Sequence, residues 1–111
     1  LIQFFFKTHI PFSKEELIQK GMDSDKTILS LKAAISKLNV LMDWHTTNIE
    51  QTLRLEADNL GIKAGQLFGT LRISLTGQRV APPLFDTMEV LGKVTCLNRL
   101  NKALQIINHV D

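Results

Sequence analysis

The sequence predicts an all-α protein, a helical bundle of about five to six helices. Apolar residues recur at three- and four-residue steps along most of the 111 residues, which is the spacing of one face of an α-helix. Glycines or prolines stand at most boundaries between these apolar stripes. The alternation typical of strands occurs only over residues 71–75, which fit a helical stripe about as well.

The first two helices are predicted from a capping signature and a long apolar stripe. Ser13 followed by Glu16 matches a capping box, so we expect a short helix over about residues 14–20. A longer amphipathic helix should open at Ser24 or Asp25. Its inward stripe consists of Ile28, Leu31, Ile35, Leu38 and Met42.

The third and fourth helices are each predicted to end at a glycine. Thr47 with Glu50 repeats the capping signature at the start of the third helix, and Gly61 ends it. Its inward residues are Ile49, Leu53, Ala57 and Leu60. The fourth helix covers about residues 63–76 and is closed by Gly77. Its buried residues are Ala64, Leu67, Phe68, Leu71 and Leu75.

Two prolines mark the start of the fifth helix. Pro82 and Pro83 suit a first helical turn and cannot lie inside a helix, so the fifth helix starts near them and stops at Gly92. Residues 78–81 then form the most distinctive loop. The fifth helix turns Leu84, Phe85, Met88 and Leu91 inward. The last helix carries Leu97, Leu100, Leu104 and Ile107 on one stripe.

Length and composition favour one folded unit. With 44% hydrophobic and 22% charged residues, the chain can build one ordinary core and not two. The chain starts on Leu1 rather than Met, and no turn signal precedes the apolar residues at its start. We therefore expect it to be a piece of a longer protein. The polar segment 20–26 is the best candidate for a hinge. We therefore assign residues 1–23 to the end of a preceding helical segment and residues 24–111 to a C-terminal helical domain.

The sequence holds no constellation that predicts catalysis or metal binding. Cys96 is the only cysteine, so this chain alone cannot form a disulfide framework or a zinc cluster. A single cysteine also favours a cytoplasmic location. We expect Cys96 to be a buried, inert thiol. His9, His45 and His109 lie far apart and have no ligand partners at helical spacing. Neither a nucleophile elbow nor a phosphate-binding glycine loop is present. We expect no cofactor here and no membrane partner, because no stretch approaches roughly 20 apolar residues.

The C-terminal half is mildly basic. Residues 63–111 hold six Lys and Arg against three Asp and Glu, whereas residues 1–62 hold seven against eight. This distribution is compatible with phosphate contacts, although a solvated helix face would look the same.

One face of the predicted fourth helix has two interpretations. On helical spacing, the face opposite the apolar stripe carries Gly65, Gly69, Arg72, Thr76 and Arg79. The favoured interpretation is tight helix packing, with Arg72 in a structural salt bridge. The alternative is a contact surface on which guanidinium groups bind a phosphate backbone or a base edge.

The segment TGQRVAPPLF, residues 76–85, also has two interpretations. Its prolines stiffen the backbone, and apolar or aromatic side chains at its end offer flat faces on which unpaired bases can stack. Alternatively, Leu84 and Phe85 fill the core at a helix start. Trp44 is interpreted as a core anchor rather than a ligand platform.

From residue 60 onward the chain reads LGIKAGQLFGTLRISLTGQRVAPPLFDTMEVLGKVTCLNRLNKAL. This segment closely resembles the C-terminal anticodon-binding domain of bacterial-type glutamyl-tRNA synthetase, a class I aminoacyl-tRNA synthetase. The upstream Trp44 and Ile49–Glu50 agree more weakly. The matching elements are Leu71-Arg72, Leu75-Thr76-Gly77, Pro82-Pro83-Leu84-Phe85, Leu91-Gly92-Lys93, Arg99-Leu100 and Lys102-Ala103-Leu104.

The resemblance implies an α-helical cage that holds the anticodon end of the tRNA for glutamate. Catalysis, with ATP and Mg²⁺, would belong to other domains of the same chain, because the family's HIGH-like and KMSKS-like signatures are missing here. We expect a cytoplasmic monomer whose parent is a glutamate–tRNA ligase, charging either the glutamate tRNA alone or the glutamine tRNA as well. The alternative is a helical protein–protein interaction module with no RNA role.

The resemblance also implies which residues contact RNA. Family members splay out the anticodon bases and hold them with arginines of the third and fourth helices and with the proline loop. Ala81 departs from the pattern, since a hydroxyl residue is common there. Lys63, Lys93, Arg99 and Lys102 are expected to contact phosphates. Carried over by position, the resemblance points to Arg54, Arg72, Ala81, Pro82, Leu84 and Phe85. The helix face and the loop add Thr76, Gly77, Arg79 and Pro83 to the expected RNA-binding residues.

Overall fold

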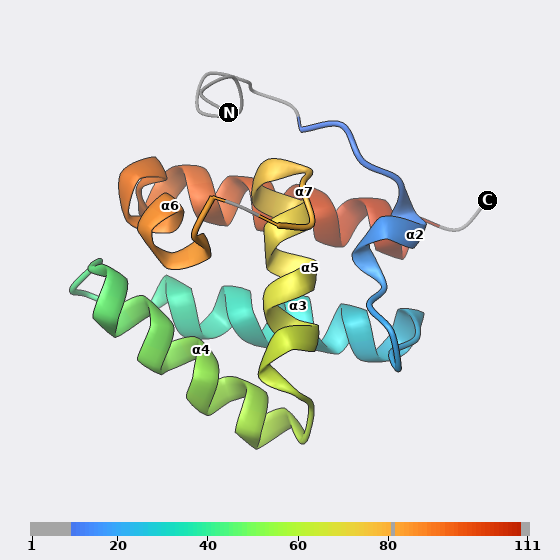
Figure 1. The fold of residues 1–111 in the computed structure, drawn as a ribbon, viewed down its shortest axis with the longest axis horizontal. Coiled ribbons are helices and arrows are strands. Elements are labelled where there is room, and N and C mark those ends of the chain that lie inside the picture. Colours follow the sequence, from blue (N-terminus) through green and yellow to red (C-terminus); the bar gives the residue numbers. More distant parts are fainter. Residues whose placement is uncertain (1–9, 81, 110–111) are drawn as a thin grey trace.

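The computed structural model describes residues 10–80 and 82–109, and in these residues it contains six helices and no strand (Figure 1). The predicted all-α fold is therefore confirmed. The helices are α2 (Lys14–Leu17), α3 (Ser24–Asn39), α4 (Thr46–Leu60), α5 (Ala64–Thr76), α6 (Leu84–Leu91) and α7 (Lys93–Asn108).

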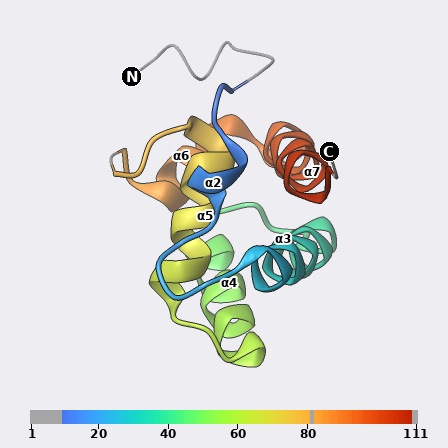
Figure 2. The ribbon, with the colours of Figure 1, turned by 90° about the vertical axis from the view of Figure 1, so that its right-hand side faces the viewer.

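Helix α5 is the centre of the bundle. It contacts α2, α3, α4, α6 and α7, and it crosses in front of the neighbouring helices α3 and α7, which Figure 2 shows nearly end-on. Leu67, Leu71 and Leu75 of α5 are fully buried, as the apolar stripe predicts. Helices α4 and α6 pack on α5 and on each other, so these three helices meet at one side of the bundle.

Two glycines end their helices as predicted. Gly61 follows α4 and Gly77 follows α5, each in the left-handed conformation with φ of 71° and 72°. A non-glycine residue is strained in this region of the backbone. At Gly77 space is limiting too, because a Cβ atom there would lie 3.0 Å from Ile10 Cγ2 and 3.2 Å from the Pro11 carbonyl oxygen.

Some predicted helix boundaries are wrong. The short helix ends at Leu17 and not near residue 20. The next helix begins at Ser24, one of the two predicted residues, and it is capped by Asp23, whose carboxylate accepts a hydrogen bond from the backbone N–H of Lys26. That helix ends at Asn39, so Met42 lies beyond it and is 93% exposed rather than inward-facing. No glycine or proline marks this end, and the apolar spacing alone continued past it.

The N-terminal segment packs on the bundle. Leu17 is fully buried, and its carbonyl accepts a hydrogen bond of 2.7 Å from the Thr70 hydroxyl of α5. The side chain of Gln19 lies against Gly69, where a Cβ atom would collide with it. This contact agrees with the close-packing interpretation of the glycine face. Residues 1–9 lie outside the described residues, and the assigned boundary after residue 23 stays a prediction.

The structure also locates the lone cysteine. Cys96 is fully buried in α7, and this burial raises the pKa of its thiol to about 12. The interpretation as a buried thiol is confirmed. Among the described residues, no helix is both long enough and apolar enough to cross a membrane.

Candidate nucleic-acid interface

Several of the residues expected to contact RNA lie together where α4, α5 and the start of α6 meet. Arg54 comes from α4, Phe68 and Arg72 lie one turn apart on α5, and Pro82 and Phe85 belong to the segment that enters α6. These five residues are called the α4–α5–α6 corner below. Direct contacts link its members, so side chains that are far apart in the sequence form one surface.

Arg54 is held on two sides and remains accessible. Its Nε donates a 2.8 Å hydrogen bond to the Glu50 carboxylate, and its guanidinium carbon lies 5.2 Å from the centre of the Phe68 ring, which is a cation–π contact. The edge of the Phe85 ring meets Phe68 at 5.0 Å between ring centres and an angle of 87°. The Arg54 side chain is nevertheless 56% exposed, so it can contact a ligand.

Arg72 contacts a backbone carbonyl and not the carboxylate that the salt-bridge interpretation required. Its Nη1 donates a 2.9 Å hydrogen bond to the backbone carbonyl of Pro82. Within the described residues, no carboxylate lies within salt-bridge distance of it, so the predicted structural salt bridge is wrong. Arg72 therefore fixes the proline segment through its backbone and remains half-buried beside the segment.

Three of the expected contact residues support the loop from inside. Thr76 is buried; its hydroxyl donates to the Arg72 carbonyl at 2.8 Å and accepts from the Gln78 N–H at 3.1 Å. Gly77 provides the left-handed turn described above. Leu84 is only 2% exposed and fills the core at the start of α6, which is the alternative that the sequence left open for it. These three residues are better placed to shape the loop than to face a ligand.

The remaining loop residues are more exposed. Pro83 is exposed and directly precedes α6. Arg79 is exposed and lies past the end of α5, so the predicted helix face that joined Thr76 to Arg79 is wrong. Val80 is 76% exposed, which the sequence did not indicate. Ala81 lies outside the described residues.

The basic residues expected to contact phosphates divide into two groups. Lys93 donates a 2.8 Å hydrogen bond to the Leu41 carbonyl, and Arg99 is 7% exposed and donates to the Leu75 carbonyl at 2.7 Å. Lys93 thus joins α7 to the segment between α3 and α4, and Arg99 joins α7 to α5. Lys63 and Lys102 are exposed and remain available for phosphate contacts.

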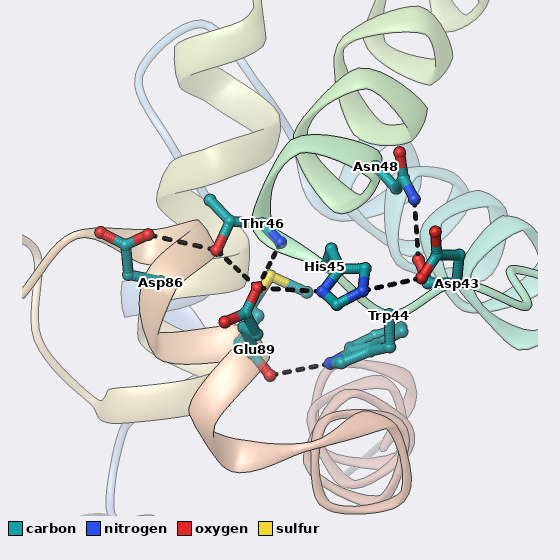
Figure 3. Close-up of polar contacts among 8 residues, drawn as sticks. Asp43, Trp44, His45, Thr46, Asn48, Asp86 and Glu89 are labelled. Carbon is teal, nitrogen blue, oxygen red and sulfur yellow. Dashed lines mark hydrogen bonds and ion pairs between the residues drawn. The ribbon is translucent and has the colours of Figure 1, made fainter.

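A group of polar contacts joins the start of α4 to α6 (Figure 3). The backbone N–H of Thr46 donates to Glu89 Oε1 at 2.8 Å, and the Thr46 hydroxyl contacts Glu89 and Asp86. The indole Nε1 of Trp44 donates to the Met88 carbonyl at 2.9 Å. The predicted capping box at Thr47 is wrong because the N-cap of α4 is His45, two residues earlier, and the distant Glu89 accepts the hydrogen bond from the first backbone N–H of the helix.

The comparisons with known proteins give the family. Residues 1–104 match the family model described as an anticodon binding domain, which is almost the whole chain. The chain belongs to the anticodon binding domain family. The match extends well upstream of residue 60, where the resemblance in the sequence was strongest.

The relatives of this anticodon binding domain are longer proteins. It is 43% identical over 107 residues to a glutamate–tRNA ligase of Roseiflexus castenholzii, covering 96% of this chain and 21% of that protein. A glutamate–tRNA ligase of Dehalococcoides mccartyi is 42% identical over 104 residues, covering 94% and 22%. The crystal structure of a glutamate tRNA ligase from Elizabethkingia meningosepticum in complex with its amino acid matches with a TM-score of 0.78 and 25% identity, over 96% and 20% of the two chains. The chain thus spans about a fifth of these relatives.

The contact between Glu89 and Thr46 predicts a pH dependence of the domain's stability. Hydrogen bonds from the Thr46 backbone and hydroxyl hold the pKa of Glu89 below its ordinary value of 4.5. Because the folded pKa is the lower one, the stabilisation is complete above pH 4.5 and is lost as the pH falls through the folded pKa. The unfolding temperature of the chain should therefore exceed that of Glu89→Gln near neutral pH, with the gap closing in acid. Thermal unfolding followed by circular dichroism measures this gap, and a gap that is constant down to about pH 3 would contradict the assignment.

Proposed function

We propose that this chain binds the anticodon loop of the tRNA for glutamate within a glutamate–tRNA ligase. The match to the anticodon binding domain family and the likeness to glutamate–tRNA ligases support this proposal, and neither suggests a protein–protein interaction module. The structural observation that carries it is the accessible Arg54 guanidinium stacked on Phe68, next to Arg72 and the proline segment.

The chemistry of the α4–α5–α6 corner suits unpaired bases. Guanidinium groups donate hydrogen bonds to base edges, and aromatic or proline faces stack on bases, at about 1–3 kcal/mol per stacked base. Arg54, Arg72, Pro82, Pro83 and Phe85 provide these groups at an accessible surface. Thr76, Gly77 and Leu84 would contribute by fixing the shape of the loop, and Arg79 by lying along it; the assignment of Ala81 stays a prediction.

The rest of the reaction belongs to the parent protein under this proposal. Other domains of the parent protein bind ATP and Mg²⁺ and join glutamate to the tRNA in protein synthesis. The parent protein acts in the cytoplasm and as a monomer. The anticodon-binding chain contributes recognition, holding the correct tRNA long enough for its acceptor end to reach the catalytic domain. Exposed Lys63 and Lys102 add phosphate contacts, which strengthen binding without reading sequence.

Binding of transcribed glutamate tRNA to the 111-residue chain tests this proposal. We expect salt-dependent binding that weakens when anticodon bases are substituted, by on the order of 1–3 kcal/mol for a base that loses its contacts. Fluorescence anisotropy with labelled transcripts measures both effects. Equal affinity for all anticodon variants would contradict the proposal, and a stable oligomer without salt-dependent RNA binding would favour the interaction module.

A further inference from the structure

We propose that Glu50 and Arg54 act as one unit that reads a base edge and disfavours a phosphate. This inference rests on the proposed function and assigns a specificity-determining role to Glu50, which was not among the residues expected to contact RNA. The pair lies one helical turn apart on α4, and its members contact each other directly at 2.8 Å.

The contacts of Arg54 leave one part of its guanidinium group available. Nε donates a hydrogen bond to Glu50, and the guanidinium carbon lies over the Phe68 ring. Among the described residues, no hydrogen bond occupies the two Nη groups. These groups form a fork of parallel donors at the exposed end of the side chain, and its direction is set by Glu50 and Phe68.

Glu50 changes what this fork can bind. A phosphate offers acceptors only, together with negative charge, whereas the Watson–Crick edge of every base combines acceptors with N–H donors. The carboxylate is 38% exposed, so it can accept a hydrogen bond from a base while Arg54 donates one. It also neutralises the charge of Arg54 and repels phosphate oxygens. An arginine without such a partner would bind phosphates as readily as bases.

Three variants of the chain separate charge from geometry. Glu50→Gln keeps a hydrogen-bond acceptor for Arg54 but removes the negative charge. Arg54→Lys keeps the positive charge but removes the planar fork. Asp58→Asn is the matched control, because it removes an exposed carboxylate from the same helix about two turns away. Each variant is titrated with glutamate tRNA transcripts carrying the native or a substituted anticodon, over a range of salt concentrations.

Each variant should change the salt dependence of binding and the anticodon preference in its own way. In Glu50→Gln the uncompensated Arg54 can bind a phosphate, so the slope of log K against log salt should steepen by about 0.7 and the anticodon preference should fall severalfold. In Arg54→Lys the preference should fall on the order of tenfold with the slope unchanged. Asp58→Asn should leave both unchanged.

The outcomes also distinguish this inference from the proposed function. If the unmodified chain shows no anticodon preference, the proposed function itself fails. If that preference exists but Glu50→Gln retains both it and the original slope, the role of Glu50 is overturned. A steeper slope in Asp58→Asn equal to that in Glu50→Gln would overturn it as well, because the effect would then follow net charge and not the pair.

Discussion

Leu71→Ala is expected to lower the free energy of unfolding of the chain by about 2–5 kcal/mol. Leu71 is fully buried on α5, the helix that contacts all five others in the described structure. Shortening its isobutyl side chain to a methyl group leaves a cavity whose walls come from several helices and cannot all collapse together. For a domain of ordinary stability, about 5–15 kcal/mol, this is a large fraction of the total.

Leu55→Ala is the control for this prediction. Leu55 lies on α4 and is 61% exposed, so its truncation should change the free energy of unfolding by no more than about 0.5 kcal/mol. Urea denaturation followed by circular dichroism measures both variants. If Leu71→Ala lost less than about 1 kcal/mol, the central position of α5 in the core would be wrong.

The features that could be predicted from the sequence are those set by local backbone chemistry and by spacing. Gly61 and Gly77 end their helices because the left-handed turn strains other residues. The buried stripe of Leu67, Leu71 and Leu75 follows from helical periodicity alone. Neither requires knowledge of any other helix, and this is why both predictions hold.

The predictions that fail depend on contacts across the fold. The start of α4 is fixed by Glu89, more than 40 residues away, which supplies the acceptor that local capping rules sought in Thr47. Met42 continues the apolar spacing of α3, but the helix has already ended at Asn39 without a local stop signal. Spacing identifies a helix face and cannot tell where tertiary contacts end it.

The candidate site divides in the same way. The residue types at Arg72 and in the proline loop left RNA binding open as one of two interpretations, whereas Phe68 was predicted only as a core residue. In the structure Phe68 is half-buried and supports Arg54 from the neighbouring helix. The contact between Arg54 and Phe68 depends on how α4 packs on α5. The spacing of residues within each helix does not predict this packing.

Arg72→Ala is expected to remove about 1–3 kcal/mol of discrimination between the native anticodon and substituted ones. The change removes donors for a base edge and also the 2.9 Å hydrogen bond that fixes the Pro82 carbonyl, so the proline segment loses its anchor on α5. Affinity for the native transcript should fall more than affinity for substituted transcripts, because the lost contacts depend on base identity.

Lys32→Ala separates this effect from a general loss of positive charge. Lys32 is exposed on α3, so its removal should weaken the binding of all transcripts slightly and equally. Competition binding with native and substituted glutamate tRNA transcripts gives the discrimination ratio for each variant. Because the Thr76 and Leu84 contacts that shape the loop remain, the unfolding temperature of Arg72→Ala should stay near that of the unmodified chain. A discrimination ratio equal to that of the unmodified chain would show that Arg72 serves the loop alone and that base recognition lies with Arg54.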